Sequence, residues 1–158
     1  DALPNKTLTV GQRVSFYQPT LDLYISMPSS DDPDGKFTLT KNPEDRAVLT
    51  VREAMRGPNE FYSFFDEDQD RVLRHNCHVI KLHDAQRSDP SRDCFMKDAS
   101  WELTRVQEPE GACMLSSVNY PEHKMGIETS ESSYIVQQLH ATMPWIIAEE
   151  GELIKAAR

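Results

Sequence analysis

A short pattern recurs three times along the chain, at intervals of about fifty residues. Each copy opens on a serine followed by a β-prone run and has an apolar residue ten positions later, as in Ser15 to Ile25, Ser63 to Leu73, and Ser117 to Ile127. A fixed period in this range is typical of repeat architectures, in which several small units bury one shared core. A single hairpin-sized unit is too small to bury its own apolar face. The sequence therefore predicts a body built from three similar units.

Most of the chain has the pattern of short strands separated by turns. The runs rich in β-branched and aromatic residues are 8–17, 37–40, 48–51, 61–65, 78–83, 101–106, 133–138 and 144–147. A closed antiparallel body leaves few exposed edges for so many short strands. We therefore predict an all-β fold, the β-trefoil, with three pseudo-repeats of about four strands each. A two-layer sandwich is the alternative, but it would not explain a threefold period.

The whole chain, residues 1–158, is predicted to form a single domain. Its repeats span approximately 8–56, 59–107 and 111–148, and residues 149–158 are expected to form a tail. The composition of 44–55 suits a helix, but the alternation within it favours a strand. Trp101 and Trp145 each precede an apolar residue two positions on, so we expect both in the core. Helix signals are few elsewhere, and 87–93 has the composition of a surface loop.

Charge and composition limit the partners. The net charge is -9 and no basic stripe offsets it, which argues against nucleic acid. No apolar run approaches the length of a membrane span. Asn5-Lys6-Thr7 is an N-glycosylation sequon, and we expect an extracellular or secretory-pathway location. Three cysteines cannot all pair within one chain: Cys77 and Cys94 could form a disulfide, or all three could be thiols.

No arrangement of residues predicts catalysis. Cysteine and histidine are present, but no motif brings a nucleophile and a base together. A glycosidase carboxylate pair cannot be identified among the 26 acidic residues. The polar run 74–78 has no zinc-ligand spacing, and 66–70 begins no EF-hand loop, because Arg71 and Cys77 stand where that loop needs Gly and Glu. We expect no enzyme activity, no metal and no cofactor.

Two segments of the second unit resemble the arabinofuranosidase B carbohydrate-binding domain family. They are Val72-Leu-Arg-His75 and Phe95-Met-Lys-Asp98-Ala-Ser-Trp101, and the third unit adds Ser116-Ser-Val-Asn-Tyr-Pro121. The resemblance covers most of the chain in arrangement but only the second unit in detail. It implies a lectin-like, non-catalytic β-trefoil in which each intact repeat can hold an arabinofuranose side chain.

The resemblance also implies which residues bind the sugar. The His after Arg and the Asp before Ala hydrogen-bond sugar hydroxyls in that family, which assigns the role to His75 and Asp98, with Arg74 beside them; Asp45 aligns with Asp98 in the first unit. A carboxylate accepts two vicinal hydroxyls and an imidazole donates to or accepts from another. On this basis alanine at both His75 and Asp98 should abolish binding and leave thermal unfolding nearly unchanged. The other interpretation is that His75 and Asp98 form an internal pair that ties two strands together.

The first and third units depart from the family pattern. Met27 and Thr129 stand at the position of His75, and His140 stands where the third unit should have Asp. The second unit therefore holds the best-preserved site. We predict a carbohydrate-binding module for arabinofuranose-type side chains, with a glycan as its partner. The alternative is a protein-interaction or structural β-trefoil domain of a larger protein that has lost sugar binding and has a protein partner.

Overall fold

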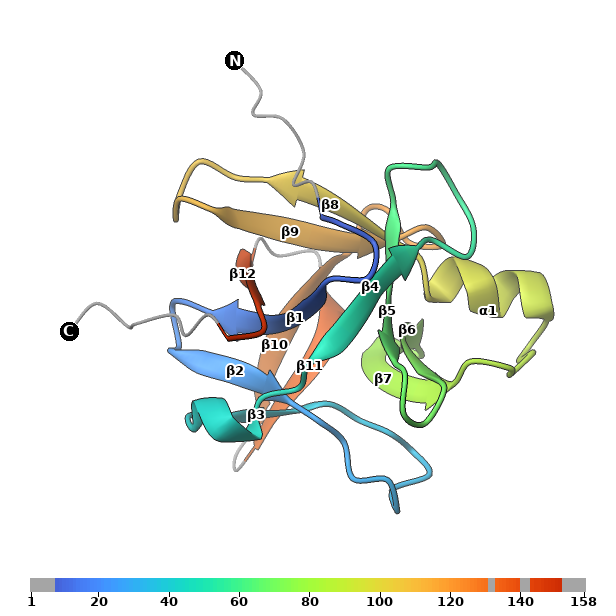
Figure 1. Ribbon diagram of the computed structural model, residues 1–158, viewed down its shortest axis with the longest axis horizontal. Coiled ribbons are helices and arrows are strands. Elements are labelled where there is room, and N and C mark those ends of the chain that lie inside the picture. Colours follow the sequence, from blue (N-terminus) through green and yellow to red (C-terminus); the bar gives the residue numbers. More distant parts are fainter. Residues whose placement is uncertain (1–7, 131–132, 140–142, 152–158) are drawn as a thin grey trace.

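Six strands of the computed structural model close into an antiparallel barrel, which Figure 1 shows. The structure describes residues 8–130, 133–139 and 143–151. In ring order the barrel strands are β1 (Arg13–Gln18), β12 (Trp145–Glu149), β9 (Ala112–Ser117), β8 (Trp101–Arg105), β5 (Tyr62–Asp66) and β4 (Leu49–Glu53), and β4 pairs with β1 to close the ring. The predicted all-β fold is confirmed.

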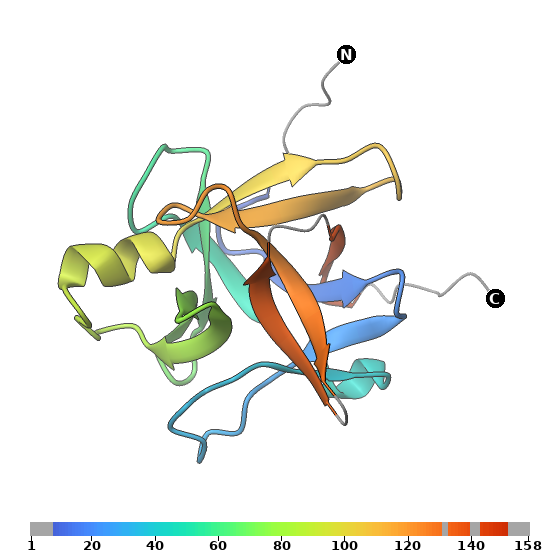
Figure 2. The ribbon, with the colours of Figure 1, turned by 180° about the vertical axis from the view of Figure 1, so that it is seen from behind.

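Three further strand pairs in the described part of the chain extend from the barrel. They are β2 (Leu23–Ser26) with β3 (Thr38–Thr40), β6 (Arg71–Asn76) with β7 (Val79–Asp84), and β10 (Lys124–Ser130) with β11 (Ser133–Leu139). The pairs also touch one another, because β11 pairs with β7 and a bridge joins Lys36 to Lys81. Figure 2, from behind, shows β10 and β11 crossing the barrel. Each hairpin follows one barrel strand along the chain.

Inside the barrel, facing residues of paired strands lie at two levels, with three pairs around the ring at each level. At one level the facing pairs are Leu49 with Val14, Trp101 with Tyr62, and Trp145 with Cys113. Two residues further along, the facing pairs are Val51 with Phe64, Leu103 with Leu115, and Ile147 with Phe16. All twelve side chains are buried, and Tyr62 is the most exposed of them at 8%. The barrel core therefore has two layers, and each of the six strands contributes one side chain to each layer.

This register corrects the alignment of the third unit. Ser15 and Ser63 each precede the Phe of the second layer by one residue, and the corresponding residue of β9 is Met114, not Ser117. The hydrogen bonds of the two buried tryptophans show a displacement in the same direction, by two residues instead of three. The indole Nε1 of Trp101 donates to the carbonyl of Leu73 at 3.2 Å, and that of Trp145 donates to Met125 at 2.9 Å. The counterpart of Leu73 is therefore Met125, not Ile127. The expectation that both tryptophans lie in the core is confirmed, because neither is exposed.

One helix was missed in the sequence. Helix α1 (Arg92–Asp98) lies between β7 and β8 and begins inside the segment predicted as a surface loop. The hydroxyl of Ser91 caps it by accepting from the amide of Cys94 at 3.1 Å, and Asp93 stands in its first turn. Phe95 is its buried anchor. A single 3₁₀ turn, η1 (Pro43–Asp45), precedes β4 in the same way, and the strand interpretation of 48–51 is confirmed.

The structure also bears on what the sequence predicts for the cysteines and for the ends of the chain. None of the three cysteines forms a disulfide: Cys77 is exposed, Cys94 is half-buried and Cys113 is buried. Glu149 belongs to β12, and the carboxylate of Glu150 accepts from Nε of Arg13 at 2.7 Å, so the barrel includes residues expected in the tail. The sequon at 5–7, His140 and residues 152–158 lie outside the described residues. Among the described residues, no helix is long and apolar enough to cross a membrane.

Candidate functional site

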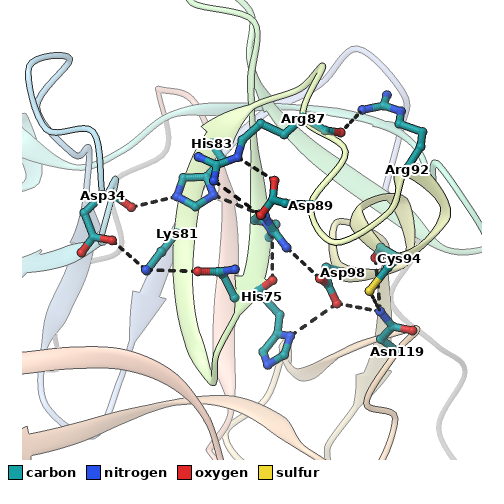
Figure 3. Close-up of polar contacts among 12 residues, drawn as sticks. Asp34, His75, Lys81, His83, Arg87, Asp89, Arg92, Cys94, Asp98 and Asn119 are labelled. Atoms are coloured by element: carbon teal, nitrogen blue, oxygen red, sulfur yellow. Dashed lines mark hydrogen bonds and ion pairs between the residues drawn. The ribbon is translucent and has the colours of Figure 1, made fainter.

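The structure brings three of the four predicted site residues together. Strand β6 supplies Arg74 and His75, and the last residue of α1 supplies Asp98. The Oδ2 atom of Asp98 accepts from Nη2 of Arg74 at 2.8 Å, and its Oδ1 atom lies 3.4 Å from Nδ1 of His75. Figure 3 shows Asp98 and His75 facing each other across this contact. The pairing of β6 with α1 thus depends on an ionic contact below the surface.

Both ring nitrogens of His75 are engaged. The backbone amide of His78 donates to Nε2 of His75 at 3.1 Å. Because a backbone N–H can only donate, Nε2 carries no proton, and the proton of the neutral ring is on Nδ1, facing Asp98. His75 is also buried, with 4% of its surface exposed. In this arrangement His75 has no nitrogen left for a sugar hydroxyl.

Arg74 is the centre of the cluster, and only 1% of it is exposed. Its Nε donates to the carbonyl of His75 at 2.9 Å, and its Nη1 donates to Oδ2 of Asp89 at 3.1 Å. Its guanidinium carbon lies 4.7 Å from the centroid of the Phe95 ring. Arg87 and Arg74 hold the pKa of Asp89 well below its usual range, against the opposing effect of burial. One guanidinium therefore joins β6, α1 and the loop that follows β7.

Asp98 is fully bonded as well. Its Oδ1 atom also accepts from the side-chain amide of Asn119 at 2.7 Å. Burial raises the pKa of Asp98, but the hydrogen bonds from His75, Asn119 and Arg74 outweigh it and hold the pKa below its ordinary value. The carboxylate is thus charged at neutral pH and shared among three donors. This geometry is that of the internal pair which the sequence left open as an alternative.

Asp45 lies apart from the cluster. It ends η1, is exposed, and accepts from the side chain of Asn42 at 3.3 Å. In Figures 1 and 2 the turn between β3 and β4 lies on the opposite side of the molecule from α1. Met27, at the first unit's counterpart of His75, is partly buried against the core. The first unit therefore contains neither the imidazole nor the buried carboxylate of the second.

An exposed aromatic surface, which no pattern in the sequence predicts, covers the buried cluster. Tyr120 is 41% exposed, and Val10 is the other exposed large apolar side chain among the described residues. The ring centroid of Tyr120 lies 4.5 Å from that of His75. The rings of His78 and His123 stand beside Tyr120, with centroids 6.4 and 6.0 Å away. We refer to Tyr120, His78 and His123 as the aromatic surface.

Asn119 connects the aromatic surface to the buried cluster. Its amide donates to the carbonyl of Cys94 at 3.2 Å as well as to Asp98. Figure 3 shows the side chain of Asn119 joined to both of these residues. Because Tyr120 is the next residue in the chain, these bonds fix the loop that carries its ring. Asn119 and Tyr120 both belong to the segment 116–121. Nothing in the sequence predicts that this segment contacts the β6–β7 turn.

The aromatic surface combines aromatic ring faces with polar atoms. A phenol ring and imidazoles offer apolar faces for stacking and polar atoms for hydroxyl groups. In the part of the chain that the structure describes, no group of three or more His, Cys, Asp and Glu side chains is arranged to hold a metal ion. A surface pocket of about 750 Å³ lies elsewhere, with Pro19, Pro109 and Pro144 among its lining residues. That pocket contains none of the predicted site residues.

Comparison with known proteins shows the fold and no family. No protein-family model matches the sequence, and no curated protein matches it. Among solved structures, a GH54 arabinofuranosidase complexed with arabinofuranosyl-alpha-1,2-xylobiose is similar, with a TM-score of 0.64 and 18% identity over 85% of this chain. This chain spans only 27% of that enzyme.

Two other solved structures are similar to the chain. A salivary protein from Culex of the Cysteine and Tryptophan-Rich family has a TM-score of 0.63 and 14% identity, with 92% of this chain and 97% of that one covered. Cry35Ab1 has a TM-score of 0.67 and 12% identity, with 96% and 39% covered. At these identities the likeness concerns the arrangement of strands.

Proposed function

We propose that this chain is a non-catalytic, carbohydrate-binding β-trefoil module whose ligand lies on the aromatic surface. The trefoil assignment is supported by the closed six-stranded ring, the three hairpins and the two core layers with threefold-equivalent registers. Carbohydrate binding is compatible with the likeness to part of an arabinofuranosidase, of which this chain covers a minor share. An extracellular location, which a salivary protein of similar fold favours, belongs to the same proposal.

The observation that carries the proposal is the exposure of Tyr120. Among the described residues, Val10 is the other large apolar side chain that is exposed. An exposed aromatic ring that is fixed by neighbours offers a flat apolar face to a sugar ring without losing conformational freedom on binding. His75 packs on Tyr120 at 4.5 Å, and Asn119 fixes its loop. A sugar stacked on Tyr120 would lie within reach of the imidazoles of His78 and His123.

In this proposal the resemblance-derived residues divide into two roles. Arg74, His75 and Asp98 support the surface from below, because their polar atoms are already bonded to one another and to their neighbours. Their direct contact with sugar stays a prediction of the resemblance, and it would require the pair to open. Asp45 stays a predicted ligand residue of the first unit, remote from the aromatic surface. The arabinofuranose-type ligand is likewise the resemblance's prediction.

A glycan array probed with the full chain tests the proposal. Immobilised arabinan, arabinoxylan and hexose-based glycans form its arms, and we expect binding to glycans with arabinofuranose side chains. Binding to hexose glycans alone would keep carbohydrate binding and overturn the arabinofuranose assignment. Silence on every arm would overturn the proposal and favour the interaction domain, whose partner would then be a protein.

A further inference from the structure

The turn between β6 and β7 has an unusual composition for its geometry. Asn76 pairs with Val79, so Cys77 and His78 form a two-residue hairpin loop. Both have left-handed backbone angles, with φ of 53° and 69°. This combination is the type I′ turn, which strongly favours Asn-Gly because the left-handed region crowds a Cβ against the neighbouring carbonyl. Neither residue of this turn is the one that its backbone prefers.

The other left-handed residues follow the usual preference. Among the described residues that are not glycine, Asp22 and Asp70 are the remaining cases of positive φ. Aspartate tolerates this region because its short side chain hydrogen-bonds the local backbone. The β6–β7 turn therefore differs from the β1–β2 and β5–β6 turns in having no aspartate at its left-handed positions. Strain that persists at an exposed turn points to a function for the side chain.

The side chain of His78 faces a ring cluster and open solvent. His78 is exposed, and its ring centroid lies 5.8 Å from His75, 5.9 Å from His123 and 6.4 Å from Tyr120. The turn geometry also directs the amide of His78 to Nε2 of His75. A glycine at this position would keep that amide and the turn, and it would remove only the imidazole. The structural role of residue 78 thus belongs to its backbone, which leaves the ring for another purpose.

We infer that the imidazole of His78, which the strained Cys77–His78 turn holds beside Tyr120, determines which sugar the aromatic surface accepts. This inference rests on the proposed function. Tyr120 supplies a stacking face, which discriminates weakly between sugars because every pyranose or furanose has an apolar face. A neutral imidazole offers one donor and one acceptor at fixed positions. It hydrogen-bonds a sugar whose hydroxyls match those positions. A mismatched sugar is left with an unpaired polar group and binds more weakly.

Cys77 and His78 can be replaced by the residues that a type I′ turn prefers. This replacement separates the effect of backbone strain on stability from the effect of the imidazole on sugar binding. The variant is Cys77→Asn with His78→Gly, and Cys77→Asn alone is the matched control. Thermal unfolding and isothermal titration are measured for each, with the strongest array ligand and with its C2 or C3 epimer. We expect the double variant to unfold about 4 °C higher, because the left-handed strain is relieved. We also expect its affinity for the preferred ligand to fall about tenfold, with the preference over the epimer largely lost.

The measurements test the role of His78, the backbone strain and sugar binding separately. A control that binds like the parent chain assigns the loss to His78. Parent-like affinity and epimer preference in the double variant would overturn the role of His78 and leave the proposed function standing. An unfolding temperature that does not rise would overturn the claim of strain. A parent chain that binds no glycan would overturn the proposed function, and the inference would fall with it.

Discussion

The guanidinium of Arg74 donates to the carboxylate of Asp98 at 2.8 Å, with 1% and 6% of the two side chains exposed. The pair joins strand β6 to the C-terminal end of helix α1 in a region from which water is largely excluded. Removal of one partner would leave the other as a buried charge with reduced compensation, which is more destabilising than the absence of both. This relationship determines how the predicted site should respond to mutation.

We expect Asp98→Ala to lower the free energy of unfolding by about 3 kcal/mol, because Arg74 then loses its most buried partner. Urea denaturation monitored by tryptophan fluorescence measures the change. Asp93→Ala is the control and should lower the free energy of unfolding much less, since Asp93 pairs with Arg56 and Lys97 on the exposed side of the same helix, where solvent screens the charges. Equal losses in the two variants would contradict the buried-pair account.

This expectation differs from the one that the family resemblance implies. That resemblance predicts nearly unchanged thermal unfolding when His75 and Asp98 are both replaced by alanine. The contacts of Asp98 with three donors instead predict a marked loss of stability in that double variant. A stable double variant without sugar binding would restore the direct role of His75 and Asp98.

His83 should make stability depend on pH. Its Nε2 lies 2.9 Å from the carbonyl oxygen of Asp34 and therefore carries the proton of the neutral ring. Burial lowers the pKa of His83, and the nearby Arg87, Arg74 and Lys81 charges lower it further, against the opposing hydrogen bond to Asp34. Below about pH 6.5 the unfolded chain takes up a proton that the folded protein resists. The stability contributed by this site is thus complete above that pH and is lost as the pH falls toward the folded pKa.

Urea midpoints at pH 7.5 and 5.5 measure this effect. The parent chain should unfold at a lower urea concentration at pH 5.5, and His83→Gln should reduce the difference between the two midpoints. An unchanged difference in His83→Gln would assign the pH dependence to other groups.

Two glycines provide a matched test of the contact between β7 and the loop before β3. Gly35 and Gly111 both have positive φ, at 67° and 83°. A Cβ on Gly35 would overlap the carbonyl oxygen of Leu82, whereas one on Gly111 would meet open space. Gly111→Ala should cost about 1 kcal/mol from backbone strain alone. Gly35→Ala should cost about 3 kcal/mol because it also displaces the bond from the amide of Leu82 to Gly35. Thermal unfolding measures both variants. Similar losses of stability in the two would contradict the close approach of Gly35 to Leu82.

Particular residues show why the sequence predicted the architecture better than the site. Trp101 and Trp145 were recognisable as core residues because each stands in an alternating run at the start of a barrel strand. The third unit was aligned incorrectly because Ser117 imitates the serine of the other units, while pairing places Met114 there. The local pattern alone cannot reveal which strand positions face each other. Ser91 caps α1, but the Ser, Asp and Pro residues around it are also typical of a surface loop, which is what the sequence pattern predicts there.

The site depends on contacts that no local pattern encodes. Arg74, His75 and Asp98 were selected through a motif resemblance, and the structure does bring them together. The aromatic surface arises where the β6–β7 turn meets the loop after β9, more than forty residues away along the chain. Only folding brings Tyr120 beside His78. The periodicity and residue spacing of a sequence cannot predict a cluster that two distant turns form together.

The most direct test is the affinity of Tyr120→Ala for the glycan selected on the array, compared with Val10→Ala. These two residues are the exposed large apolar side chains of the described protein, and only Tyr120 belongs to the aromatic surface. Loss of aromatic stacking should weaken binding about tenfold in Tyr120→Ala. The affinity of Val10→Ala should match that of the parent chain, as should the unfolding temperature of both variants to within a few degrees. Parent-like affinity in Tyr120→Ala would contradict the account.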